Sequence, residues 1–153
     1  MNILDGLAAC AGNWRGSSTL QDPHSNAPDE SPSSAAVTPA LGGRFIRLDY
    51  DWSYHGAPQQ GSLLIGFDTQ ADAVTAHWID TWHMGDKVMA CQGARPDGST
   101  LSVRGSYAAP PGPDWGWRID ITPEVGRSLR IVMFNIWPDG REELAVEAAY
   151  RPA

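Results

Sequence analysis

The clearest pattern in the chain is an alternation of apolar and polar residues over residues 44–54. The even positions carry Arg, Ile, Leu, Tyr, Trp and Tyr, whereas the odd positions are mostly Arg, Asp and Ser. Successive side chains of a β-strand point to opposite sides, so this pattern predicts a strand with one buried face. Further segments of strand character follow at short intervals: 62–68, 73–82, 87–94, 100–107, 116–121, 128–137 and 142–151.

Short turns join these segments. Arg-Pro-Asp-Gly-Ser at residues 95–99 and Trp-Pro-Asp-Gly-Arg at residues 137–141 combine a proline that presets φ with a glycine that accepts positive φ. Turns this short join antiparallel neighbours. Eight or nine strands connected in this way form a meander, and closure into a barrel removes its free edges. The sequence therefore predicts an all-β fold, an antiparallel up-and-down β-barrel.

The first 42 residues lack this alternation. Apolar residues recur at helical spacing in the first eleven residues, which predicts a short N-terminal helix ended by Gly12, with a first strand at 13–18. Residues 19–42 are rich in Pro, Ser and Ala without periodicity, and they predict a long loop or lid. We expect residues 1–153 to form a single domain.

Charge and composition narrow the classes of partner. With a net charge of −7, the chain has no broad basic surface for nucleic acid and is repelled by anionic lipid. No apolar run approaches the ~18 residues that cross a bilayer, and Asp5 interrupts the only apolar run of an N-terminus that has no basic region. We expect no nucleic-acid or membrane partner and a cytoplasmic location, whereas a homodimer is left open.

The two cysteines, Cys10 and Cys91, form no C-x-x-C motif and no disulfide framework. In a reducing cytoplasm we expect two free thiols. The sequence leaves a single Cys10–Cys91 bridge open as the alternative.

Two short motifs resemble those of a known group of barrels. Gly12-Asn13-Trp14 follows the predicted helix, and Arg151 closes the last predicted strand. In the lipocalin-like, or calycin, barrels a Gly-x-Trp on the first strand packs its indole against an Arg from the last strand. The resemblance implies that Trp14 plugs the closed end of the barrel and that the Arg151 guanidinium stacks over it.

The central part of the chain is similar to a bacterial calycin-like family of uncharacterised proteins, domain of unknown function 1579. The similarity runs from Ala11 to Arg151, and it implies the barrel fold rather than an activity. Four ordered segments carry it: Leu41-Gly42-Gly43-Arg44-Phe45, Gly56-Ala57-Pro58 with Gly61, Ile65-Gly66-Phe67-Asp68, and Trp78-Ile79-Asp80-Thr81.

Residues 12–16, Gly-Asn-Trp-Arg-Gly, are also similar to the haem-binding nitrobindin-type barrels. Those barrels hold the haem iron through a histidine late in the chain, whereas the last histidine of this sequence is His83. We therefore expect no haem, and the sequence predicts no other cofactor.

Asp80 is the leading candidate for a functional residue. It shares the parity of Trp78 and Trp82, on a face that is otherwise apolar and is therefore expected to line the barrel interior. Burial of a carboxylate costs free energy unless the charge is paired. Arg44 has the inward parity of its own strand, so it is the expected partner of Asp80. One interpretation is a polar handle in a ligand cavity, with a pKa raised by desolvation. The alternative is a structural Arg–Asp pair or a residue at the rim.

Aromatic residues form a stripe on the same predicted interior. Tyr and Trp each combine a large apolar body with one polar atom, which suits a ligand cavity as well as a filled core. The candidate ligand-binding residues are Arg44, Tyr50, Trp52, Tyr54, Trp78, Asp80 and Trp82.

The segment 77–84 also holds two histidines. On one regular strand, His77 and His83 share a face but lie about 20 Å apart, and Asp80 points to the other face. Metal ligands must lie within a few ångströms of one another. The sequence therefore predicts no metal site, with His77 and His83 on the outer face or at the rim.

Three functions fit these features. The first is a binding module that holds a small apolar or aromatic molecule, with Arg44, Tyr54 and Asp80 orienting its polar end. The second is a cofactor-free acid–base enzyme of the lyase or isomerase type on the same barrel, which rests on analogy of fold. The third is a filled barrel with a structural role.

Overall fold

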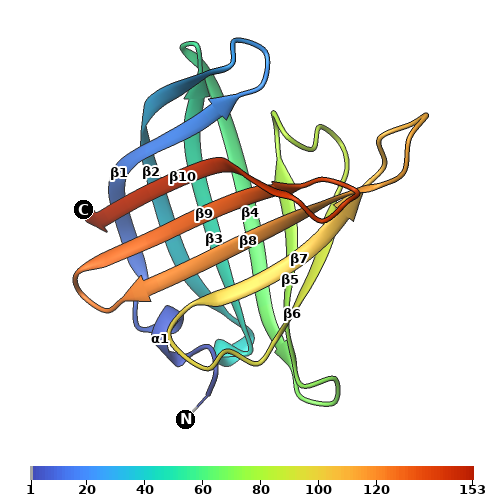
Figure 1. Cartoon of the computed structure of the whole chain (residues 1–153). Helices are drawn as coiled ribbons and strands as arrows, with labels where there is room; N and C mark the ends of the chain where they lie inside the picture. The colour runs from blue at the N-terminus through green and yellow to red at the C-terminus, as the bar shows by residue number, and fades with distance from the viewer. Residues whose placement is uncertain (1) are drawn as a thin grey trace.

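Ten strands form a closed antiparallel barrel in the computed structural model, which describes residues 2–153 (Figure 1). The all-β up-and-down barrel predicted from the alternation is confirmed. Each strand pairs with its neighbours in the chain, and β1 pairs with β10 to close the ring. The strands are β1 (Gly12–Asp22), β2 (Ala27–Ala40), β3 (Phe45–Tyr54), β4 (Ala57–Asp68), β5 (Ala73–Asp80), β6 (Met89–Ala94), β7 (Leu101–Tyr107), β8 (Trp115–Glu124), β9 (Ser128–Ile136) and β10 (Glu142–Pro152).

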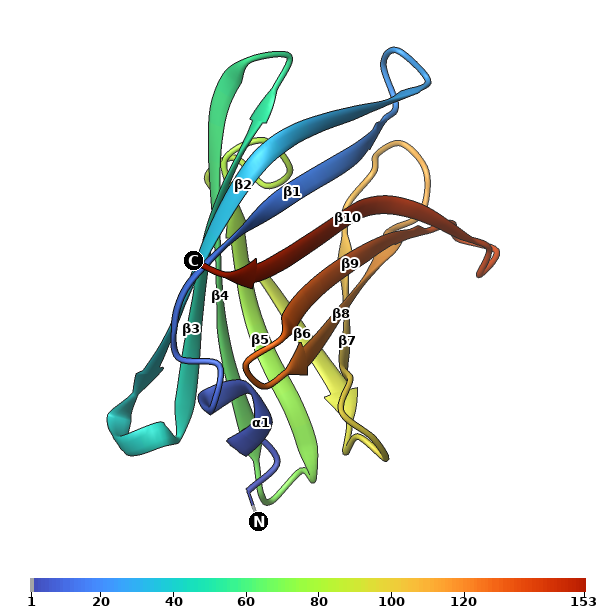
Figure 2. The ribbon, with the colours of Figure 1, turned by 90° about the vertical axis from the view of Figure 1, so that its left-hand side faces the viewer.

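The two ends of the barrel differ. The short helix α1 (Asp5–Ala8) lies against one end, which confirms the predicted N-terminal helix (Figure 2). A 3-10 turn, η1 (Leu41–Gly43), joins β2 to β3 at that same end. The opposite end carries the turns after β1, β3, β5, β7 and β9, and we call it the open end. Among residues 2–153 there is no helix of the length and apolarity needed to cross a bilayer.

Trp14 belongs to the buried core at the helix end of the barrel. Its indole Nε1 donates to the carbonyl oxygen of Cys10 at 2.8 Å, and Leu7 of α1 is in the same core. The implied stacking of Arg151 over Trp14 is wrong. Arg151 is opposite Arg15 in the β1–β10 register and is exposed, because its parity points it outward while Trp14 points inward.

The predicted loop over residues 19–42 is wrong. These residues complete β1 and form the whole of β2, with only a short turn between them. Inward positions of β2 carry small side chains, such as Ser31, Ser33 and Ala35, which are buried but give no apolar alternation. The barrel therefore has ten strands rather than the eight or nine expected, and residues 19–42 form no lid over it.

Side chains replace part of the backbone ladder between β2 and β3, which begins only at Ala35. Beyond that point, Ser33 Oγ donates to the Asp51 carbonyl at 2.6 Å, and Asp51 Oδ1 accepts from the Ser34 amide at 2.7 Å. This explains how Pro32 fits into β2, because a proline has no amide hydrogen to give to a ladder.

Neighbouring strands β6 and β7 share a single register pair, Gln92 with Arg104. The other ladders of the ring have six or more pairs. Cys91 on β6 and Cys10 after α1 are buried free thiols, as expected from the sequence.

Candidate functional site

Asp80 lies in a row of three residues that crosses neighbouring strands. Tyr50 on β3 pairs with Gly61 on β4, and Gly61 pairs with Asp80 on β5. Residues paired across a sheet point to the same side, so any side chain at Gly61 would separate the other two. A methyl group there would overlap the Tyr50 ring. The ring lies across Gly61 instead, and its hydroxyl donates to Asp80 Oδ2 at 2.7 Å.

The Asp80 carboxylate is surrounded by hydrogen-bond donors. Oδ1 accepts from the backbone amides of Trp82 and His83, both at 2.9 Å, and lies 3.1 Å from His83 Nδ1. Oδ2 accepts from Tyr50 and, at 3.3 Å, from Trp52 Nε1. The interior parity predicted for Asp80 is confirmed, and its side chain is 1% exposed. The carboxylate thus links β3 to β5 and to the turn that follows β5.

These donors keep Asp80 ionised. Burial acts to raise the pKa of the carboxyl, but the hydrogen bonds from His83 and from the hydroxyl of Tyr50 outweigh it and lower the pKa. The expected rise in pKa is therefore wrong, because desolvation is only one of several opposing causes. Burial and the neighbouring Asp80 raise the pKa of Tyr50 well above its ordinary value, so this hydroxyl remains a donor.

His83 lies inside the barrel mouth rather than on the outer face. β5 ends at Asp80, two residues earlier than predicted, and the Met84 amide then donates to the Asp80 carbonyl at 2.9 Å. This turn brings the His83 ring back to Asp80, with its side chain only 10% exposed. His77 is exposed, as predicted. The sequence signal for the turn is Asp80 itself, whose side chain bonds amides two and three residues on.

Four indoles surround the His83 ring. The ring centroids lie between 4.7 and 5.6 Å from that of His83, and the indoles belong to Trp52, Trp78, Trp82 and Trp117. Trp78 and Trp117 also stack on each other, with centroids 5.3 Å apart and planes at 12°. His83 Nε2 is buried and has no hydrogen-bond partner among the described residues.

Arg44 is not the partner of Asp80. It is exposed and follows η1, where Gly42 and Gly43 have φ of 68° and 87° and turn the chain before β3 begins. Arg44 lies six positions before Tyr50, the β3 residue beside Asp80, and six positions span about 20 Å along an extended strand. The expectation that Arg44 points inward is wrong because the alternation extends one residue beyond the strand.

The space for a ligand lies at the open end. Around Tyr50, Trp52 and Asp80 the barrel interior keeps a void of about 10 Å³, room for roughly one water molecule. A pocket of about 630 Å³ lies at the mouth, and its lining includes Trp78, Trp82 and His83. The open space therefore lies at the mouth rather than in the interior cavity predicted around Asp80.

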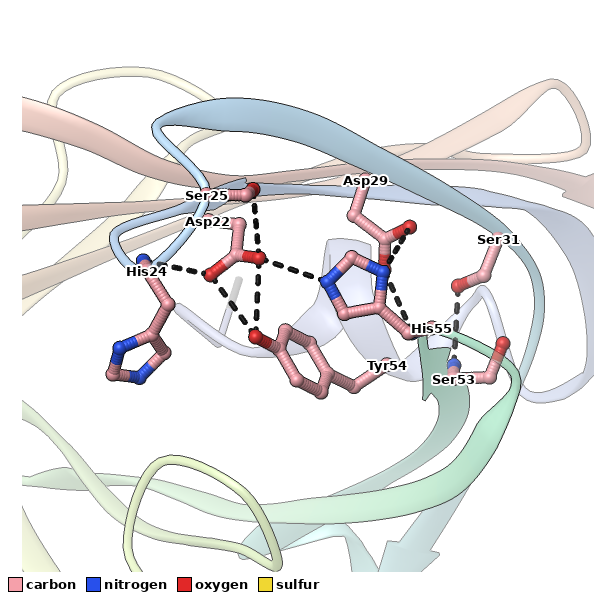
Figure 3. Close-up of polar contacts among 8 residues, drawn as sticks. All are labelled: Asp22, His24, Ser25, Asp29, Ser31, Ser53, Tyr54 and His55. Atoms are coloured by element: carbon pink, nitrogen blue, oxygen red, sulfur yellow. Dashed lines mark hydrogen bonds and ion pairs between the residues drawn. The ribbon is translucent and has the colours of Figure 1, made fainter.

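A second polar cluster ties the β1–β2 turn to the β3–β4 turn (Figure 3). Asp22 at the end of β1 accepts from the hydroxyls of Ser25 at 2.9 Å and Tyr54 at 3.1 Å, and it lies 3.0 Å from His55 Nε2. The Tyr54 ring packs on Trp82, with centroids 5.1 Å apart. Tyr54 thus supports Trp82 in the wall of the pocket. The sequence did not predict a role for Asp22, because Asp22 lies in the segment that was expected to be a loop.

The side chain of Asp22 is fully buried. Burial acts to raise its pKa, but hydrogen bonds from the His24 amide and from the side chains of His55, Ser25 and Tyr54 hold the pKa well below its usual range. The cluster therefore holds an ionised carboxylate at neutral pH.

Acid is expected to destabilise the protein through these two carboxylates. A carboxyl whose pKa is lower in the folded state stabilises the fold above the unfolded pKa of about 4, and this contribution is lost as the pH falls through the folded pKa. Melting temperatures measured from pH 7 to pH 2 should fall below about pH 4. In D22N the curve should start lower and fall less steeply, whereas the exposed-turn variant D68N should follow the wild type. Parallel curves for D22N and the wild type would contradict the role of Asp22.

Within residues 2–153, no group of three or more His, Cys, Asp or Glu side chains is arranged to hold a metal ion. What the geometry does offer is a carboxylate–imidazole pair at the base of an aromatic pocket.

The fold and site define a ten-stranded antiparallel barrel with a pocket at its open end. A family model described as "Protein of unknown function (DUF1579)" matches residues 5–152, so the chain belongs to this family. The crystal structure of Rv2717c from M. tuberculosis is similar, with a TM-score of 0.66 and 12% identity over 100% of this chain and 98% of that one. At this identity the likeness shows the fold alone. A comparison with curated proteins gives no match.

Proposed function

We propose that the protein binds a small apolar or aromatic molecule in the pocket at the open end of the barrel. The observation that carries this proposal is the 630 Å³ of space next to the Trp78–Trp117 stack and the His83 ring. This volume falls within the range typical of small-molecule sites, which are mainly apolar with a few polar groups. Side chains almost fill the barrel interior next to this pocket, so the strands serve to hold the pocket residues in place at the open end.

The rim of the pocket favours an apolar ligand. Val88 and Leu144 both line the pocket, and they are 62% and 39% exposed. Large apolar side chains left in water at the entrance of a pocket are typical of a site that a ligand covers. Elsewhere in the lining, the Tyr107 hydroxyl donates to Asn135 Oδ1 at 2.6 Å, which leaves the Asn135 amide hydrogens as a polar contact for the ligand.

Filling the pocket should abolish binding. Ala145 lines the pocket, so in A145F the added ring should occupy the site and weaken binding of anilinonaphthalene sulfonate by about tenfold or more. The dye fluorescence measures affinity. The matched control is A149F, on the exposed outer face of the same strand, which should bind like the wild type. Native mass spectrometry of protein purified from its own host tests for a retained natural ligand. Equal dye binding by both variants, with no retained molecule, would refute the proposal.

A second candidate is a cofactor-free acid–base enzyme in the same pocket. The pair of Asp80 and His83 favours it, because a carboxylate that holds one imidazole nitrogen orients the other as a general base. A molecule identified by native mass spectrometry would separate the two functions. A pure binder returns it unchanged after incubation, whereas an enzyme converts it and loses this conversion in H83F.

A further inference from the structure

The contacts of Asp80 fix the tautomer of His83. An ionised carboxylate only accepts hydrogen bonds, and Asp80 Oδ1 lies 3.1 Å from His83 Nδ1. In a neutral imidazole at this position, the hydrogen is therefore on Nδ1. His83 Nε2 then carries a lone pair, which makes it a hydrogen-bond acceptor.

No donor within the described residues forms a hydrogen bond with this nitrogen. Nε2 is buried and has no partner in the described part of the chain, and the side chain of His83 is nine-tenths buried. Buried polar atoms without a partner are rare in folded proteins because they lose their hydrogen bonds to water. Since His83 lines the 630 Å³ pocket, a donor brought by a ligand would satisfy it.

We propose that the pocket recognises a planar aromatic molecule with an N–H or O–H group, which donates a hydrogen bond to His83 Nε2. This inference rests on the proposed function and names its ligand class. The indoles of Trp78, Trp82 and Trp117 around the imidazole provide flat apolar surfaces for the ring of such a molecule. Indoles and phenols combine the required plane and donor.

Trp82 is the least buried of the four indoles that pack on His83. Its indole packs edge-on against His83, with centroids 4.7 Å apart, and it is only half-buried on the turn after β5. The ligand reaches Nε2 when this indole moves aside. The Trp82 backbone stays in place, because its amide is bonded to Asp80.

Indole and N-methylindole test the donor directly, because they differ only in the N–H group. Titration of isotope-labelled protein, followed by NMR, should give a dissociation constant about tenfold lower for indole. In H83F, which keeps a flat ring but removes the acceptor, the two constants should agree within about twofold. The control H77F changes the exposed histidine of β5 and should keep the full difference.

The histidine ring nitrogens provide a measurement that needs no variant. In the wild type, the Nε2 resonance of His83 should move on addition of indole but not of N-methylindole. Equal affinity for the two compounds, or an Nε2 resonance that does not respond to indole, would overturn the inference. Binding of anilinonaphthalene sulfonate without binding of indole would also overturn it while leaving the proposed function intact. Failure of all three probes would remove the proposed function itself.

Discussion

Replacement of Asp80 by asparagine is expected to lower the melting temperature by about 10 °C, as measured by differential scanning calorimetry at pH 7. Asparagine has only one acceptor oxygen. In either orientation of its amide, the NH2 group would point at hydrogen-bond donors that now bind the second carboxylate oxygen. The amides of Trp82 and His83 lie on one side, and the groups of Tyr50 and Trp52 lie on the other. Loss of a buried charge that several donors surround costs about 3 kcal/mol.

The control for D80N is D68N. Asp68 also accepts from two backbone amides, those of Gln70 and Ala71, but it does so in an exposed turn where asparagine serves equally well. D68N should change the free energy of unfolding by less than about 0.5 kcal/mol. If D80N were as stable as D68N, the carboxylate would not be the group that holds the turn after β5.

A single methyl group at Gly61 should have a comparable effect. In G61A the Tyr50 ring must leave its place over β4, so the hydroxyl loses Asp80 and the Trp78 indole loses its acceptor. Overpacking together with a lost buried hydrogen bond is expected to cost about 3 kcal/mol. Denaturant unfolding measures this cost, and dye binding in the pocket should fall with it.

Two further variants isolate the cause of this effect. G98A places a methyl group in a turn where nothing lies within 4 Å, and it should be tolerated. In a Y50A background the methyl group at Gly61 meets no ring, so its cost should shrink to less than about 1 kcal/mol in a double-mutant cycle. Additive costs would mean that Gly61 serves some purpose other than making room for Tyr50.

The sequence predicts the fold well where the inward residues are large. β3 alternates Ile46, Leu48 and Trp52 with polar residues, and all three are buried. β2 escapes prediction because Ser31 and Ser33 occupy the same kind of position without an apolar side chain. Whether a serine is buried depends on the strands that pack around it, and the sequence of β2 itself does not show which strands these are.

The site is predictable only in part for the same reason. Parity is enough to place Asp80 inside, because β5 is regular up to that residue. The position of His83 depends on where the strand stops, and the stop is made by hydrogen bonds that Asp80 forms beyond the strand. Arg151 differs, because the local alternation of β10, in which Ala148 and Tyr150 are buried, already points it outward. Local patterns do not contain the point at which β5 stops.

A closed barrel is expected to open first where the fewest residues pair between neighbouring strands. In this barrel that place is the boundary between β6 and β7, which share a single register pair. Cys91 lies on β6 at this seam, and burial raises the pKa of its thiol to about 11. Only the thiolate reacts readily with alkylating reagents, so a closed barrel keeps this sulfur chemically silent. We therefore expect the rate of alkylation at Cys91 to report how often the barrel opens between β6 and β7.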